Sequence, residues 1–173
     1  MEIREIKSDE VERAGEVVVA AYQALEGAPP IDENGYANEL RAVARRAREA
    51  VVLVAVDNAD ELVGCVTYVP DDASPFAEGL APGEASMRML GVAPDARRRG
   101  MGRSLVEACI ARARAEGRER VFIHSGTWMR EAHAMYESLG FVRVPERDWT
   151  PVPDVPLYGF ALDLATAPRE VDR

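Results

Sequence analysis

The sequence has few of the residues that mark a secreted or metal-binding protein. Only two of its 173 residues are cysteine and two are histidine, too few for a disulfide framework or a zinc site. Cys65 falls in an expected strand and Cys109 on the inner face of an expected helix, so we expect both to be buried, reduced thiols. No stretch approaches the ~20 apolar residues of a membrane helix, and the first residues lack the basic and apolar segments of a signal peptide. We therefore expect a cytoplasmic protein without a bound metal.

Negative charge exceeds positive charge. The 21 lysine and arginine residues are outnumbered by 30 aspartate and glutamate residues, which gives a formal net charge of −9 at pH 7. An acidic chain is poorly suited to nucleic acid or to an anionic membrane, and we expect neither as a partner. With 47% hydrophobic and 29% charged residues, the composition is typical of a globular protein. We expect one domain over residues 1–164 and a loose tail over 165–173.

Hydrophobic periodicity and turn residues divide the chain into strands and helices. Strands 51–56 and 61–69, separated by a turn, should pair as a hairpin. The arginines of the second helix, Arg41, Arg45, Arg46 and Arg48, are expected to form a mostly solvated face. The order of elements predicts an α/β (α+β mixed sheet) fold in three layers, with helices on both faces of the sheet. About seven strands, at 3–6, 51–56, 61–69, 84–92, 120–124, 142–145 and 157–164, and four helices, at 9–25, 36–50, 102–116 and 130–139, make up this prediction.

One basic segment stands out against the acidic background. After the strand expected at 84–92, Pro94 and Asp95 end the strand, and Gly100 and Gly102 open a helix. The glycines let the backbone turn sharply and bring several N–H donors together. The first turn of a helix presents N–H groups without intrahelical partners, together with partial positive charge. The segment also carries Arg97, Arg98, Arg99 and Arg103 and is therefore suited to hold a pyrophosphate.

Two familiar phosphate loops do not fit this segment. A P-loop needs a lysine followed by serine or threonine after its last glycine, whereas Gly102 is followed by Arg103. A dinucleotide fingerprint needs a small residue where the chain has Leu105. The pattern Arg97-x-x-Gly100-x-Gly102 instead resembles the acyl-CoA signature of the GNAT superfamily of N-acyltransferases. Downstream, Ala132-x-x-x-Tyr136-x-x-x-Gly140-Phe141 resembles a second GNAT segment, and the likeness covers nearly the whole chain.

The resemblance implies a GNAT-like N-acetyltransferase that uses acetyl-CoA as co-substrate and a small primary amine as acceptor, with direct transfer of the acetyl group. It implies that the backbone of Leu90 and Val92 binds the pantetheine arm and the thioester. Tyr136 matches the tyrosine that protonates the departing thiolate, and a packed core tyrosine is the alternative. A homodimer is a further possibility, because dimers are common in such families. The pyrophosphate would be bound by Arg97, Arg98, Arg99, Gly100, Met101, Gly102, Arg103 and Ser104.

Two positions depart from the GNAT pattern. Met129 stands where many relatives have asparagine, and Ser86 stands where many have a glutamate that acts as a base on the amine. The candidate bases are Glu84, two residues earlier on the same strand face, and His124, because histidine titrates near neutrality. The alternatives for both are a rim carboxylate and a core histidine. The missing glutamate keeps a non-catalytic acyl-CoA-binding or regulatory domain open as an alternative, and a nucleotide-binding protein is a third reading.

Four aromatic residues are candidates to line an acceptor pocket, with core packing as the alternative: Tyr22, Phe76, Trp128 and Trp149. His133 is expected to face solvent. The acidic segment 70–84, with Asp32 and Glu33, would favour a cationic amine unless these carboxylates are only solvated. The sequence leaves antibiotic, polyamine, amino-acid, peptide and protein-lysine acceptors open.

Overall fold

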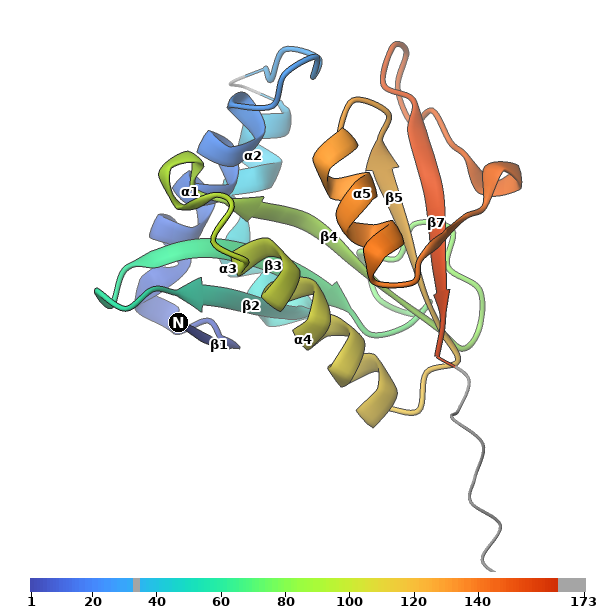
Figure 1. The fold of residues 1–173 in the computed structure, drawn as a ribbon, viewed down its shortest axis with the longest axis horizontal. Coiled ribbons are helices and arrows are strands. Elements are labelled where there is room, and N and C mark those ends of the chain that lie inside the picture. The colour runs from blue at the N-terminus through green and yellow to red at the C-terminus, as the bar shows by residue number, and fades with distance from the viewer. Residues whose placement is uncertain (33–34, 165–173) are drawn as a thin grey trace, which may run out of the picture.

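A seven-stranded mixed sheet forms the centre of the molecule (Figure 1). The structure, a computed structural model, describes residues 1–32 and 35–164, so Glu33 and the expected tail at 165–173 lie outside the described residues. The strand order is β1-β2-β3-β4-β5-β7-β6. β4 and β5 pair in parallel, and the other neighbouring strands pair antiparallel. The strands are β1 Glu2–Glu5, β2 Val51–Val56, β3 Leu62–Val69, β4 Glu84–Val92, β5 Arg120–Gly126, β6 Val142–Arg143 and β7 Leu157–Asp163.

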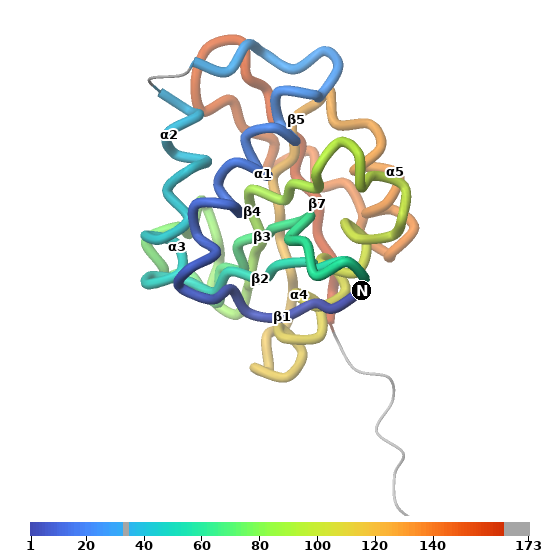
Figure 2. The backbone as a smooth tube through the Cα atoms, turned by 90° about the vertical axis from the view of Figure 1, so that its left-hand side faces the viewer, coloured from blue at the N-terminus to red at the C-terminus, as the bar shows by residue number. Residues whose placement is uncertain are grey.

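Helices cover both faces of this sheet, which confirms the predicted three-layer fold (Figures 1 and 2). A Cβ added to Gly91 of β4 would meet Ala21 of α1, and one added to Gly64 of β3 would meet Leu105 of α4. The helices α1 to α3 therefore lie on one face, and α4 and α5 lie on the other. They are α1 Val11–Gln23, α2 Tyr36–Arg41, α3 Val43–Glu49, α4 Met101–Ala115 and α5 Arg130–Ser138, with short 3-10 turns η1 Ser8–Glu10, η2 Pro94–Ala96 and η3 Pro145–Arg147.

The core lies between these layers. β3 is buried along its whole length, because α1 covers one of its faces and α4 the other. The inner stripe of α4 repeats at helical spacing through Leu105, Cys109 and Ala113, all with 0% exposure. Cys65 and Cys109 are buried and unpaired, as predicted. Among the described residues, no helix is both long and apolar enough to cross a membrane.

The second predicted helix is broken into α2 and α3 at Ala42, whose ψ of 42° is not helical. The break changes which side of α3 faces the sheet. Val43 and Arg46, three residues apart, are buried, whereas Ala44 is exposed. The prediction that Arg46 belongs to a solvated face was therefore wrong: its side chain is 1% exposed.

Most other boundaries agree with the prediction to within two residues. The hairpin of β2 and β3 is confirmed, with Val54 opposite Cys65. The strand predicted at 142–145 is shorter, because Pro145 begins η3 and a proline has no N–H to donate to a strand ladder.

Candidate active site

β4 and β5 pair only near their beginnings and then diverge (Figure 1). Their ladder consists of Glu84 opposite Arg120 and Ala85 opposite Val121, and β5 continues as a partner of β7 as far as Gly126. The second half of β4, which contains Leu90 and Val92, therefore keeps β3 as its partner but has no β5 partner in the described ladder. Backbone N–H and C=O groups on this edge can pair with an extended ligand.

A β-bulge lies beside this edge. Thr67 of β3 pairs with Arg88 and Cys65 pairs with Gly91, so one residue of β3 faces two residues of β4. Met89, at the bulge, has a φ of +53°, which costs a residue with a side chain about 1–3 kcal/mol. Bulges redirect side chains next to functional sites, and this one directs Arg88 and Met89 into a cavity on the α1–α3 face.

The loop from β4 to α4 has the sharp turn and the glycine-capped helix start that its sequence predicts. Gly100 caps α4 with a φ of +82°, and the first helical hydrogen bond runs from the Ser104 N–H to the Gly100 carbonyl at 3.0 Å. The N–H groups of residues 101–103 precede that bond and point out of the helix end. A Cβ on Gly100 would meet nothing within 4 Å, and one on Gly102 would meet only Val92, at 3.6 Å. The space over the helix end is thus open, and a pyrophosphate fits its donors and its partial positive charge.

The arginines of this loop differ in their surroundings. Arg97 donates to the Ala21 carbonyl at 2.8 Å and so ties the loop to the end of α1. Arg98 is 86% exposed and lies 3.4 Å from Glu131, while Arg103 pairs with Glu107 at 3.0 Å. Ion pairs at the surface contribute little to stability, so Arg98 and Arg103 can exchange these carboxylates for phosphate oxygens.

Tyr136 lies in α5 with only 6% of its surface exposed. Its ring packs against Phe141 and Phe160, with centroid separations of 5.6 and 5.9 Å. Burial raises the pKa of the Tyr136 phenol, and the Cys109 thiol adds to the effect. The hydroxyl makes no hydrogen bond to any residue in the described part of the chain. Tyr136 is therefore a protonated phenol at neutral pH.

Glu84 does not join Tyr136. Its carboxylate accepts hydrogen bonds from both terminal nitrogens of Arg147, at 2.7 and 2.8 Å, and from the Ala81 N–H at 2.9 Å. Arg120 lies 3.7 Å away. Burial disfavours the charged form, but the hydrogen bonds and the charges of Arg147 and Arg120 outweigh it, so the pKa of Glu84 lies below its usual value. A carboxylate held in this way is a poor proton acceptor.

His124 also lies apart from Tyr136. Its Nε2 lies 2.8 Å from the Arg147 carbonyl, and its ring packs against Phe122 and Trp149. Side chains alternate along a strand, so His124 and Phe122 occupy the face of β5 opposite the one that α5 covers. The structure thus does not bring the three predicted catalytic residues, Tyr136, Glu84 and His124, together.

His133 does not face solvent, which corrects that expectation. It is half-buried, lies 3.2 Å from the Ser125 hydroxyl and packs against Tyr158 and Phe160. Burial lowers the pKa of His133, and the nearby Arg143 adds to this effect.

The four candidate aromatic residues do not line one common pocket among the described residues. Phe76 lines the cavity beside β4, and the ring of Tyr22 lies 6.1 Å from that of Tyr36. Trp128 packs over Gly126 and near Gly27, and its buried Nε1 has no hydrogen-bond partner among the described residues. Trp149 packs against His124 instead. Of the acidic groups, Glu78 pairs with Arg88 at 2.9 Å.

The Glu84–Arg147 pair leads to a stability prediction. We expect Arg147→Met to lower the free energy of unfolding by about 3 kcal/mol, because it leaves a buried carboxylate without its main partner. Arg147 is a quarter exposed, which keeps the value at the lower end of the range for buried pairs. Urea denaturation at pH 7 measures the change. Glu146→Gln, which alters an exposed neighbour without a described ion pair, is the control and should change stability by less than about 0.5 kcal/mol.

The same pair fixes the direction of the pH dependence. Because the pKa of Glu84 is lower in the folded protein, the pair stabilises above the ordinary glutamate pKa of about 4.3 and loses its effect as the pH falls through the folded value. The difference between wild type and Arg147→Met should therefore shrink below about pH 4. A difference that stays constant down to pH 3 would contradict this assignment.

Comparison with known proteins identifies the family of this chain. The family model described as "Acetyltransferase (GNAT) family" matches residues 18–141, a range that includes β4, the loop to α4, and α5 with Tyr136. No match was found among the curated proteins.

Several solved structures share the fold. A GNAT-family acetyltransferase from Staphylococcus aureus superposes with a TM-score of 0.73 at 16% identity and covers 95% of this chain and 99% of its own. A ribosomal-protein-alanine N-acetyltransferase from Brucella melitensis gives a TM-score of 0.69 at 21% identity, with 95% and 100% covered. A protein from Salmonella typhimurium, solved with its cofactor acetyl-CoA, gives a TM-score of 0.67 at 20% identity, with 96% of this chain and 95% of its own covered. At these identities the likeness shows the fold, whereas the family model covers well over half of the chain and shows the family. The chain belongs to the GNAT family of acetyltransferases.

Proposed function

We propose that this protein transfers an acetyl group directly from acetyl-CoA to a primary amine. The observation that supports this most strongly is that the open helix end at Gly100–Gly102 and the unpaired edge of β4 follow each other in one continuous segment. The helix end is suited to the pyrophosphate, and the edge at Leu90 and Val92 is suited to the amide groups of the pantetheine arm. A ligand bound at both places has its thioester near the point where β4 and β5 separate.

In this proposal Tyr136 is the general acid. The amine nitrogen forms a bond to the thioester carbonyl carbon, the carbon–sulfur bond breaks, and the sulfur leaves with the electron pair. Tyr136 gives its hydroxyl proton to that sulfur and recovers a proton from water, and the amine loses one proton. The buried surroundings of Tyr136 also disfavour a bare thiolate, which helps a phenol to protonate it.

We propose no side chain of this protein as the base. Glu84 is held by Arg147, and His124 lies on the other face of β5. The amine therefore binds as the free base or releases its proton to water. In this proposal Glu84 and His124 are positioning residues that fix η3 against the sheet through the Arg147 side chain and carbonyl.

This assignment predicts the pH profile of the reaction. We expect kcat/KM to rise with pH until the amine is unprotonated, near pH 8 for the α-amine of a peptide and at higher pH for a free amino acid, and then to stay level up to about pH 10. The plateau follows from Tyr136, because burial raises its pKa and keeps the acid protonated. Initial rates from pH 6 to 10 measure the profile. A fall between about pH 7 and 9 would show that a more acidic group than this phenol supplies the proton.

Turnover tests the proposed function. Free thiol and acetylated amine should form together when the full chain, acetyl-CoA and a panel of amines are mixed, with mass spectrometry of the products. Tight binding of acetyl-CoA without release of thiol for any amine would instead support a non-catalytic acyl-CoA-binding domain. Stronger thermal stabilisation by ATP or NAD than by CoA would contradict both the acetyltransferase and the acyl-CoA-binding domain.

A further inference from the structure

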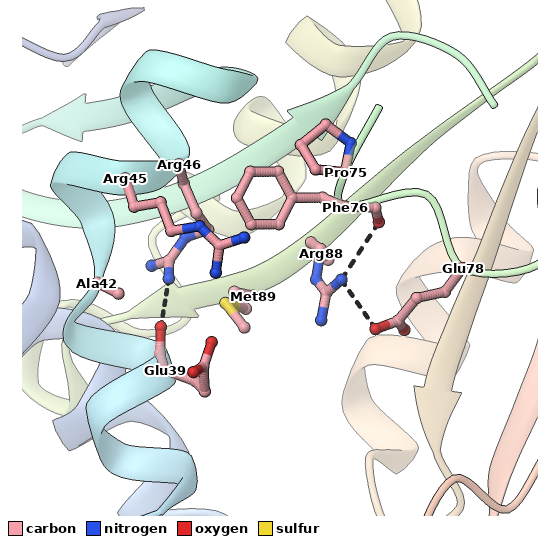
Figure 3. A pocket seen from close by; sticks show the side chains of 9 residues that line it. All are labelled: Glu39, Ala42, Arg45, Arg46, Pro75, Phe76, Glu78, Arg88 and Met89. Carbon is pink, nitrogen blue, oxygen red and sulfur yellow. Dashed lines mark hydrogen bonds and ion pairs between the residues drawn. The ribbon is translucent and has the colours of Figure 1, made fainter. Parts of the chain in front are cut away.

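A cavity of about 180 Å³ lies on the α1–α3 face, beside the bulge of β4 (Figure 3). Its walls come from α2, α3, the loop between β3 and β4, and β4. Three guanidinium groups and two carboxylates line it, from Arg45, Arg46, Arg88, Glu39 and Glu78. The chain as a whole has a net charge of −9. A cavity with an excess of positive charge in such a protein favours a bound anionic group.

Arg46 brings a buried positive charge to this cavity. Its side chain is 1% exposed and donates to the Thr67 hydroxyl at 3.0 Å and to the carbonyls of Leu40 and Glu39. All three acceptors are uncharged, and no carboxylate of the described chain forms an ion pair with Arg46. Burial lowers the pKa of Arg46, and the charge of Arg88 adds to this effect. An anion in the cavity would compensate both charges.

Arg88 is the group that can bind such an anion. It lies opposite Thr67 in the sheet, so Arg46 and Arg88 reach the cavity from different elements, with Met89 between them (Figure 3). Its Nη1 is paired with Glu78 at 2.9 Å and with the Phe76 carbonyl at 3.2 Å. Its Nε is buried without a hydrogen-bond partner in the described part of the chain. A carboxylate pairs with two donors of one guanidinium edge, and the edge that contains Nε lacks such a partner.

The cavity adjoins the residues that we propose for acetyl transfer. Arg88 and Met89 directly precede Leu90 in β4. The cavity therefore borders the stretch of β4 edge that has no β5 partner in the described ladder.

We propose that the acceptor is a small amine that also carries a carboxylate, as an amino acid does, and that Arg88 binds this carboxylate in the cavity beside β4. The positive potential of Arg46 strengthens that binding, and the amine then lies toward the separation of β4 and β5. The inference rests on the proposed function and adds the class of acceptor.

The test uses acceptors that differ only in the carboxylate. The full chain is given acetyl-CoA with individual L-amino acids, with the carboxamide of each, and with putrescine as a diamine without a carboxylate, and thiol release gives kcat/KM. We expect kcat/KM for the best amino acid to exceed kcat/KM for its amide by about tenfold or more, because a charge-assisted hydrogen-bond pair is lost in the amide. A preference for putrescine or for the amides would overturn the inference.

Substitutions connect this preference to Arg88. In Arg88→Gln the ratio of kcat/KM for the amino acid to kcat/KM for its amide should fall below about threefold. Arg88→Lys keeps the charge but not the planar edge and should give an intermediate ratio. The matched control is Arg48→Gln, which removes a positive charge from an exposed position of α3 that does not line the cavity, so this variant should keep the ratio. Circular dichroism melting checks folding, and Arg88→Lys carries the test if Arg88→Gln does not fold. An unchanged ratio in the Arg88 variants would refute the proposed role.

A binding measurement without turnover distinguishes failure of this inference from failure of the proposed function. Amino acids and their amides are titrated by calorimetry into the protein saturated with CoA. If amino acids bind more tightly than amides but nothing is acetylated, the cavity assignment stands and the proposed function fails. If amines are acetylated without a preference for a carboxylate, the proposed function stands and this inference fails. If nothing binds and nothing is acetylated, both fail.

Discussion

Tyr136→Phe should lower kcat about 10²- to 10⁴-fold, the usual contribution of a positioned general acid. The affinity for acetyl-CoA should stay within about threefold, because the hydroxyl is needed only when the sulfur leaves. The substitution keeps the ring that packs against Phe141 and Phe160. Single-turnover thiol release at saturating acetyl-CoA, with the acceptor found in the panel, measures the effect.

A second tyrosine provides the control. Tyr158 lies on β7, is 36% exposed and packs against Arg143 and His133, so Tyr158→Phe removes a hydroxyl without approaching the proposed site and should leave kcat within about twofold. Tyr136→Phe should also melt within a few degrees of wild type, since its hydroxyl has no hydrogen-bond partner in residues 1–32 and 35–164. An unchanged kcat in Tyr136→Phe would make this residue a packing tyrosine only.

The geometry of the loop at Gly100–Gly102 could be predicted from the sequence because its cause is local. Gly100 is needed for the positive φ that caps α4, Gly102 keeps the helix end open, and both lie within a few residues of the strand and the helix that they join. Strand and helix periods depend on near neighbours as well. The order of elements and the mixed sheet were therefore predicted correctly, with errors mainly at ends.

The surroundings of charged side chains could not be predicted in this way, because they depend on residues far apart in the chain. Glu84 is neutralised by Arg147, 63 residues later, and Arg46 is buried because one residue, Ala42, interrupts a helix whose sequence has no helix breaker. A pattern of alternating residues places Glu84 on a face but says nothing about its partner. The same limit explains His133, which was expected in solvent and packs against Phe160 of β7.

In the proposed reaction the two faces of the sheet cooperate. Tyr136 and α4 belong to one face, whereas Tyr22, Arg46 and Arg88 belong to the other. In a continuous sheet these groups would be separated by paired strands. Because the β4–β5 ladder ends at Ala85 and Val121, an acyl donor bound from the α4 side and an amine bound from the α1 side can meet at the edge of β4. This arrangement keeps the proposed acid and the proposed carboxylate site on opposite sides of the reacting carbonyl.

Gly102→Glu should weaken acetyl-CoA binding about 100-fold while the protein stays folded. The new carboxylate would stand at the open helix end, repel the pyrophosphate and occupy its N–H donors. Charge-assisted hydrogen bonds contribute about 1.5–3 kcal/mol each, so the loss of one or two corresponds to this change. The helix itself should gain stability, because glycine inside a helix costs up to about 1 kcal/mol relative to other residues and an acidic side chain is favourable in the first turn. Loss of binding would therefore not reflect unfolding.

The control for Gly102→Glu is Ala111→Glu, which adds the same charge to an exposed position further along α4. It should leave CoA affinity within about threefold, because exposed charges more than ~10 Å apart are largely screened at moderate salt. Calorimetric titration with CoA measures both variants, and melting with and without CoA gives an independent value, since a ligand that binds only the folded protein raises its stability in proportion to RT ln(1 + [L]/Kd). Equal affinities in wild type and Gly102→Glu would mean that the diphosphate binds away from this helix end, and the assignment of Leu90 and Val92 to the pantetheine arm would lose its anchor.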